Sequence, residues 1–258
     1  MAHAGSEVPH LLHFRVSHYN EKVRWALDHK GWPHTRRALV PGFHILPVRW
    51  LSGQNKVPVL VLDGQPLCGS SRILEEIERR RPERPLFPED PALRERARRL
   101  EAFFDDEVAP DLRLLFWSTY LDRPADCARM ATDGFPTLTR TLWRLCLFWM
   151  RPLFRRNMGV DRAHIDRARI RIGEYVDRIE AEIGPHGYLV GDRFGVADLA
   201  VASVMTAILR PPEFPYPLPE PWPEALVALR ASVADRPGCK WVMDIYRRHR
   251  GTSAEILR

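Results

Sequence analysis

Short apolar runs alternate with helical patterns over the first 80 or so residues of the chain. Strand-like runs are expected at residues 11–16, 35–40, 57–62 and 65–68. Helices with apolar positions at helical spacing are expected at residues 21–30 and 70–81. Asp63-Gly64 between two β-rich runs is a strong hairpin signal. Residues 41–53, which contain Pro47, are expected to be irregular, so the predicted order is β-α-β-(irregular)-β-β-α.

A proline-rich segment separates this region from a helical one. Residues 83–90 are expected to form a linker, and helices are expected at residues 91–120, 136–156, 162–183, 196–210, 223–234 and 240–250. The proline-rich run 211–223 is predicted to cross the surface in an extended form, because proline lacks the amide donor that a helix requires. We therefore predict an α/β domain over residues 1–82 and an all-α domain over residues 91–258.

Composition and charge narrow the classes of protein to consider. The chain has 258 residues, 45% of them hydrophobic and 28% charged, which is typical of a globular protein. Its longest uncharged apolar stretch, residues 199–209, is shorter than the ~18 residues of a membrane-spanning helix. Residues 1–10 lack the features of a secretory signal, so a cytoplasmic location is expected. The net charge of +6 leaves a nucleic-acid or lipid-surface binder as a weaker alternative, and we expect no nucleic-acid partner.

Several common catalytic patterns are missing from the sequence. There is no glycine-rich phosphate loop, GxSxG elbow, HExxH pair or EF-hand loop. The four cysteines form no CxxC pair, and the ten histidines are dispersed. We therefore expect neither a metal nor a nucleotide cofactor.

Pro58 is unusual because it lies in a run that otherwise reads as a central strand. A proline there removes a donor from the hydrogen-bond ladder. A cis Val57-Pro58 bond would resolve this conflict. In a thioredoxin-like β-α-β-β-α arrangement, such a bond turns the backbone of the preceding residue, here Val57, toward an extended thiol peptide that pairs as an added strand.

Four segments in the matching order resemble the glutathione transferase superfamily. Residues 17–31 are similar to its strand-to-first-helix segment, and residues 56–60, Lys-Val-Pro-Val-Leu, to its cis-proline loop. Residues 69–74 resemble its (Asp/Glu)-Ser-x-x-Ile helix start, and residues 188–199 resemble its (Ser/Thr)-x-x-Asp capping signature. The resemblance implies an N-terminal thioredoxin-like domain followed by a helical-bundle C-terminal domain, usually assembled as a homodimer.

The resemblance also implies a site. Its catalytic candidates are Ser17, Asn20 and Tyr19, with Ser17 at the position of the family's serine or cysteine and Tyr19 as a reserve candidate whose other role is packing. A hydroxyl at Ser17 could donate to the glutathione sulfur and lower its pKa, or could simply begin a helix. The candidates for binding glutathione as co-substrate are Lys56, Val57, Pro58, Gly69, Ser70 and Ser71.

Two departures from the family pattern bear on activity. Gly69 stands where relatives often carry an acid, so the γ-glutamyl ammonium loses one charged partner and affinity for glutathione is expected to be weak. Asn20 stands where many relatives carry cysteine, and an asparagine can hydrogen-bond a thiolate but cannot form a disulfide. Ser70 opens a helix, whose free amides favour a carboxylate, although it could serve only as a helix cap. The sequence thus predicts a transferase that joins glutathione to a hydrophobic electrophile. The alternative is a related protein that binds a ligand or partner without turnover.

Residues 138–154 are rich in aromatic side chains, with arginines at positions 140, 144 and 151 that form one stripe of a helix. Three interpretations stay open for this helix. It could belong to the core, line a hydrophobic substrate pocket, or lie in a membrane interface.

Overall fold

The computed structural model describes residues 8–216, 218 and 220–257, and divides the chain into two compact units. One unit comprises the described residues up to Phe87 together with those from Arg248 onward, and the other comprises Pro88–Arg247. The division therefore falls inside the predicted linker. It differs from the predicted domains at the C-terminal end, where the last residues pack on the first unit rather than the second.

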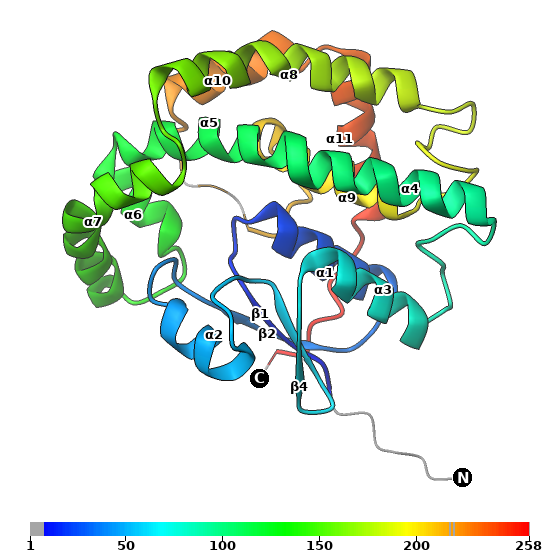
Figure 1. The fold of residues 1–258 in the computed structure, drawn as a ribbon, viewed down its shortest axis with the longest axis horizontal. Helices are drawn as coiled ribbons and strands as arrows, with labels where there is room; N and C mark the ends of the chain where they lie inside the picture. The colour runs from blue at the N-terminus through cyan, green and yellow to red at the C-terminus, as the bar shows by residue number, and fades with distance from the viewer. Residues whose placement is uncertain (1–7, 217, 219, 258) are drawn as a thin grey trace. The chain divides into compact units, whose positions relative to one another are not determined.

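A four-stranded mixed sheet forms the centre of the first unit (Figure 1). Its strands are β1 (His10–His13), β2 (Thr35–Ala38), β3 (Val59–Leu62) and β4 (Gln65–Cys68), in the spatial order β2-β1-β3-β4. Strand β1 is parallel to β2 and antiparallel to β3, and β3 pairs with β4 as the predicted hairpin. Asp63 and Gly64 have φ values of 50° and 73°, as a type I′ turn requires.

Three helices accompany the sheet: α1 (His18–His29), α2 (Ile45–Ser52) and α3 (Ser70–Arg80). Helix α1 begins three residues before its predicted start. The prediction that residues 41–53 are irregular is wrong, because α2 occupies most of them. Pro47 falls in the first turn of α2, where the backbone amides have no intrahelical partner and a proline is tolerated. Val48 of α2 packs on Leu12 and Val59 of the sheet.

The second unit is helical, as predicted. Its helices are α4 (Pro91–Phe103), α5 (Ala109–Leu121), α6 (Pro124–Ala131), α7 (Thr137–Asn157), α8 (Arg162–Glu182), α9 (Val196–Leu209), α10 (Glu224–Val233) and α11 (Pro237–His249), of which α11 runs across the division into the first unit. A π-helical turn, η1 (Phe104–Val108), joins α4 to α5, where one uninterrupted helix was expected. Helix α6 was not predicted. The described part of 211–223 contains no helix, as expected for so many prolines, while residues 217 and 219 lie outside the described residues.

Helix α9 is the centre of the second unit. Every one of its residues except Ala207 is buried. Its start is held by Asp198, whose carboxylate accepts hydrogen bonds from the backbone amides of Leu189 and Gly195, both at 2.8 Å. These two bonds tie the preceding loop to the first turn of the helix. None of the described helices is long and apolar enough to cross a bilayer.

The fold class predicted from the sequence is therefore confirmed, with a small thioredoxin-like α/β unit followed by a helical one.

Candidate functional site

Strand register brings three of the predicted site segments to the same end of the sheet. Leu12 near the end of β1 pairs with Val59 at the start of β3, and Val59 pairs with Cys68 at the end of β4. The segments that continue from these three residues carry Ser17, Val57 and Ser70, respectively. Positions separated by up to 53 residues in sequence thus meet because antiparallel strands reverse direction at each step.

Ser17 is the N-cap residue of α1. Its backbone is extended (φ −94°, ψ 128°) and its carbonyl accepts from the Glu21 amide at 2.9 Å. Its side chain makes no capping hydrogen bond, although an N-cap serine commonly does. The half-buried hydroxyl is therefore not engaged in holding the helix, and it is available to a bound group.

The two other catalytic candidates lie in the first turn of α1. Tyr19 is half-buried, and its ring lies 4.1 Å from that of His18, which is consistent with a packing role. Asn20 is fully buried, and within the described chain neither its amide nitrogen nor its amide oxygen has a hydrogen-bond partner. Because such groups are normally paired when buried, Asn20 is an exception that the sequence alone does not reveal.

Arg24 holds the loop that carries Ser17. Its guanidinium donates to the carbonyl oxygens of Phe14 at 2.8 Å and Arg15 at 3.1 Å, and to Glu21 at 2.8 Å. It also lies 2.9 Å from Nδ1 of His13. Since an arginine can only donate, this contact fixes Nδ1 of His13 as an acceptor.

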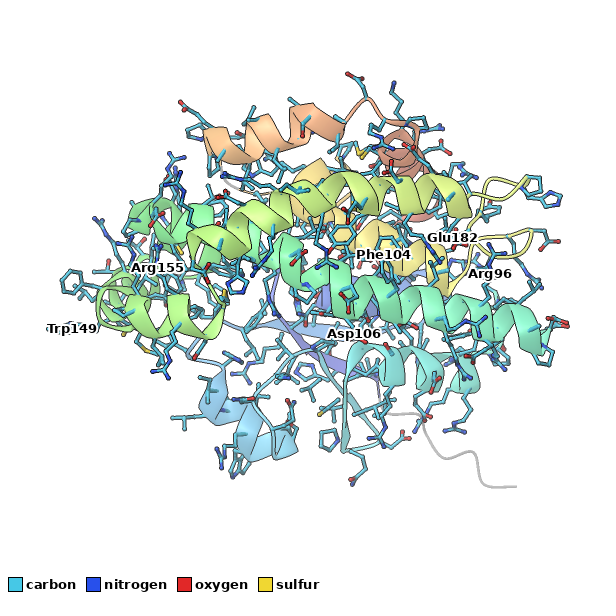
Figure 2. The ribbon with its side chains drawn as sticks, turned by 45° about the horizontal axis from the view of Figure 1, so that its top comes forward. Arg96, Phe104, Asp106, Trp149, Arg155 and Glu182 are labelled. Carbon is cyan, nitrogen blue, oxygen red and sulfur yellow. The ribbon has the colours of Figure 1, made fainter. Side chains whose placement is uncertain are left out.

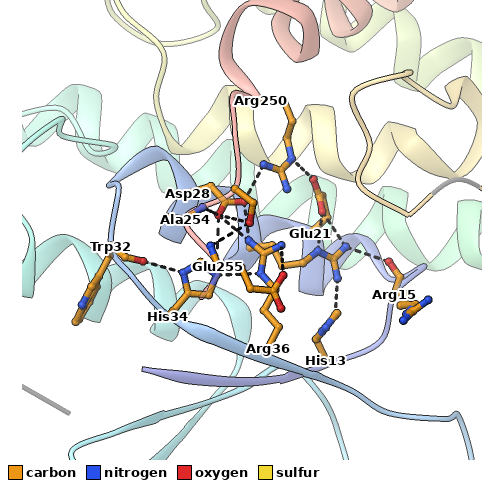
Figure 3. A network of polar contacts seen from close by, with 12 residues as sticks. His13, Arg15, Glu21, Asp28, Trp32, His34, Arg36, Arg250, Ala254 and Glu255 are labelled. Carbon is orange, nitrogen blue, oxygen red and sulfur yellow. Dashed lines mark hydrogen bonds and ion pairs between the residues drawn. The ribbon is translucent and has the colours of Figure 1, made fainter. Parts of the chain in front are cut away.

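The C-terminal residues complete this network, which Figure 3 shows. Nε of Arg250 donates to Glu21 at 2.6 Å, and its Nη1 donates to Asp28 at 2.9 Å. Asp28 also accepts two bonds from Arg36, at 2.6 and 2.7 Å, and one from the Ala254 amide at 2.8 Å. All of these charged side chains are almost completely buried.

Sequence reasoning did not find this network. The available signal was the spacing of Glu21, Arg24 and Asp28, which places all three on one face of α1 although α1 is buried over most of its length. Three charged groups on a buried helix require partners. The partner from the chain terminus, Arg250, could not be identified from local pattern.

Burial and neighbouring cations set the pKa values in this network. Burial alone would raise the pKa of Asp28, but the nearby Arg36 and Arg250 guanidinium groups outweigh it and lower that pKa below its ordinary value. Burial lowers the pKa of His13 well below the ordinary value, with the Arg24 cation adding to the effect. Burial likewise lowers the pKa of His34 to about 4. Both histidines are therefore neutral at pH 7.

The Val57-Pro58 peptide bond is cis, as predicted. The pairing of β3 with its neighbouring strands begins at Val59, so the backbone of Val57 is not paired in the sheet. The adjoining Lys56 is exposed, and its backbone is held by Gln54, whose side chain accepts from the Lys56 amide at 2.5 Å and donates to the Lys56 carbonyl at 2.7 Å. Gln54 is thus a supporting residue that the motif comparison did not include.

Gly69 has a structural reason to be glycine. Its φ of +88° lies in the region that residues with a Cβ rarely adopt. Ser70 follows as the first residue of α3; it is buried, and within the described chain its hydroxyl has no hydrogen-bond partner. Ser71 is exposed in the same turn. The start of α3 therefore offers unpaired backbone amides and a free hydroxyl, a combination suited to a carboxylate.

Among the described residues, no group of three or more His, Cys, Asp or Glu side chains is arranged to hold a metal ion.

Comparison with known proteins agrees with this arrangement. The family model "Glutathione S-transferase, N-terminal domain" matches residues 11–85, and "Glutathione S-transferase, C-terminal domain" matches residues 162–231. A probable glutathione S-transferase from Nicotiana plumbaginifolia is 26% identical over 193 residues, which cover 74% of this chain and 69% of the relative.

Solved structures show the same fold. A glutathione S-transferase from Methylobacterium radiotolerans, in complex with glutathione sulfonate, is 24% identical with a TM-score of 0.56 and covers 91% of this chain and 93% of its own. The theta class enzyme from Xanthomonas axonopodis pv. citri, with glutathione bound, is 22% identical with a TM-score of 0.57, covering 96% and 99%. With both domain models matched in order over more than half of its residues, the chain belongs to the glutathione S-transferase superfamily.

Proposed function

We propose that this protein binds glutathione and transfers its thiolate to a hydrophobic electrophile. The observation that carries the proposal is the meeting of three free polar groups at one end of the sheet, namely the Ser17 hydroxyl, the Val57 backbone and the start of α3 at Ser70. Relatives of the same fold have been solved with glutathione or its sulfonate bound, which supports glutathione as the ligand.

Each group has a distinct role in this proposal. The amides and hydroxyl at Ser70 bind the γ-glutamyl carboxylate, since the positive end of a helix favours an anion. The Val57 backbone pairs with the peptide backbone of glutathione as a short added strand. Gly69 supplies the backbone shape but no carboxylate, so the γ-glutamyl ammonium lacks one charged partner and we expect modest affinity.

Ser17 acts on the sulfur. Its hydroxyl donates a hydrogen bond to the thiolate, which lowers the thiol pKa because the charged form is stabilised. The thiol proton passes to solvent, and the sulfur lone pair forms a C–S bond with the electrophilic carbon. A displaced leaving group departs with its bonding electrons. Proximity of the two bound reactants contributes the rest of the acceleration.

Calorimetric titration with glutathione tests the binding part. Replacing Ser70 by Ala should weaken binding by about 1 to 3 kcal/mol, roughly 5- to 150-fold in Kd, because a hydrogen bond to a charged group is lost. Ser232→Ala, which removes an exposed serine hydroxyl of α10, is the matched control and should leave Kd unchanged. Equal Kd values for the wild type and Ser70→Ala would overturn the carboxylate assignment.

Conjugation of a chlorodinitrobenzene, followed as a function of pH, tests the catalytic part. Ser17→Ala should raise the pKa of bound glutathione and lower the rate near neutral pH, on the order of tenfold for each pKa unit. If Ser17→Ala retains the full rate while Asn20→Ala loses it, Asn20 is the donor to the sulfur. Tight glutathione binding without turnover of any electrophile would instead favour a non-catalytic relative. The homodimer implied by the family stays a prediction, which light scattering in solution can test.

A further inference from the structure

Helix α7 presents an apolar face to solvent. Trp143 and Leu147 are its buried residues, whereas Leu138, Leu145 and Trp149 are 69%, 61% and 80% exposed. Figure 2 shows Trp149 pointing away from the neighbouring helices. The interpretation of this helix as core is therefore wrong for most of its length. Single exposed apolar residues need no explanation, but a contiguous set marks an interaction surface.

The exposed residues form one stripe. At 100° per residue, five of them fall within an arc of about 80° along the helix; these are Leu138, Leu142, Leu145, Trp149 and Leu153. Phe148 adds a 74% exposed ring beside the stripe, in edge-to-face contact with Trp149 at 5.5 Å. We call these six residues the α7 face. A tryptophan and a phenylalanine on the same face are typical of helices that lie in a membrane interface.

The charge of α7 is entirely positive. The helix contains five arginines and no aspartate or glutamate. Arg156 lies in line with the stripe at the C-terminal end of the helix. Arg155, Arg144 and Arg151 lie on the far side of Phe148, about 80° to 120° around the helix from the nearest stripe residue. Arg151 and Arg155 share Asp122, at 2.6 and 2.7 Å, while Arg144 and Arg156 have no ion-pair partner in the described part of the chain.

From this combination we propose that the α7 face docks on an anionic lipid surface. The apolar stripe enters the boundary between headgroups and acyl chains, and the two exposed arginines without an ion-pair partner in the described chain, Arg144 and Arg156, contact lipid phosphates and carboxylates. Charge complementarity selects this occupant over a second copy of the chain. Two α7 helices brought face to face would place Arg156 of each copy at the shared interface, where α7 supplies no acidic residue to pair with it.

Vesicle co-sedimentation tests the proposal on the full chain. Binding to phosphatidylcholine vesicles containing phosphatidylserine should exceed binding to pure phosphatidylcholine at least tenfold, and should weaken as salt is raised. Leu145→Ser with Trp149→Ser should reduce binding to the anionic vesicles at least tenfold. The double variant Arg144→Gln with Arg156→Gln should also reduce binding to the anionic vesicles at least tenfold, because it removes two positive charges. It should also flatten the dependence of binding on salt concentration.

Two exposed positions of α8 serve as matched controls. Ile170 is 72% exposed and the side chain of Arg162 is 96% exposed, so Ile170→Ser and Arg162→Gln remove the same kinds of group from another helix. Both should bind vesicles like the wild type. Absence of wild-type binding to anionic vesicles, or equal losses in the control variants, would overturn the proposal. Concentration-dependent self-association that Trp149→Ser abolishes would assign the α7 face to a second copy and refute the lipid surface.

Discussion

Arg250 offers a sharp test of how the C-terminal residues stabilise the first unit. Its guanidinium, 2% exposed, connects Glu21 at 2.6 Å and Asp28 at 2.9 Å, two carboxylates on the same face of α1. It also lies 5.8 Å from the centre of the Trp25 ring. Replacing Arg250 by Ala removes all three interactions and leaves both carboxylates without one of their partners.

The expected cost follows from what the two carboxylates retain. Removing one member of a buried ion pair typically costs 3–5 kcal/mol, because the remaining charge stays buried and uncompensated. Here Glu21 keeps Arg24 at 2.8 Å, and Asp28 keeps Arg36 and the Ala254 amide. The loss should therefore fall near the lower limit, about 3 kcal/mol of unfolding free energy.

Urea unfolding, followed by far-UV circular dichroism, measures this loss directly. Arg247→Ala is the matched control, because Arg247 is 70% exposed and pairs only with Asp244 in the described chain. Exposed pairs contribute little, so its cost should stay below about 0.5 kcal/mol. If Arg250→Ala costs no more than Arg247→Ala, the buried network does not hold the terminal residues to the first unit, and the reasoning is refuted.

Three further predictions concern pH, capping and thiols. Because the pKa of His34 falls from its ordinary value near 6.5 to about 4 on folding, its contribution to stability is full above pH 6.5 and should decline by about 3 kcal/mol by pH 4. Acid titration of the unfolding midpoint checks this, because His34→Gln should lose less stability than the wild type over this range. Gly195→Ser should raise the unfolding free energy by a few tenths of a kcal/mol. The extended backbone at this N-cap position (φ −142°) accepts a serine, whose hydroxyl adds a capping hydrogen bond to α9. A lower unfolding midpoint in the variant would contradict this prediction. Iodoacetamide should label the exposed Cys146 first and leave Cys127 and Cys239 unmodified. Burial raises the pKa values of these two thiols to about 12 and about 11, so little reactive thiolate forms. Peptide mass mapping of the labelled protein tests this order.

The local sequence pattern alone predicted the β3–β4 hairpin and the cis peptide bond beside it. The strand-like runs at residues 57–62 and 65–68 and the Asp63-Gly64 pair between them predicted the β3–β4 hairpin, and both turn residues adopt the positive φ that such a turn requires. The conflict between Pro58 and a central strand predicted the cis bond. The same local information missed α2, since Pro47 breaks a helix only when it lies beyond the first turn.

Only the tertiary structure decided which distant groups become partners. Glu21 and Arg250 are separated by 229 positions, and no spacing rule connects them, because their contact depends on where the chain terminus packs. Likewise, the pattern of α7 is compatible with core, pocket or interface, and its exposure is set by how much of the helix its neighbours cover. Sequence periodicity specifies which side chains share a face, whereas the packing of whole elements specifies what that face contacts.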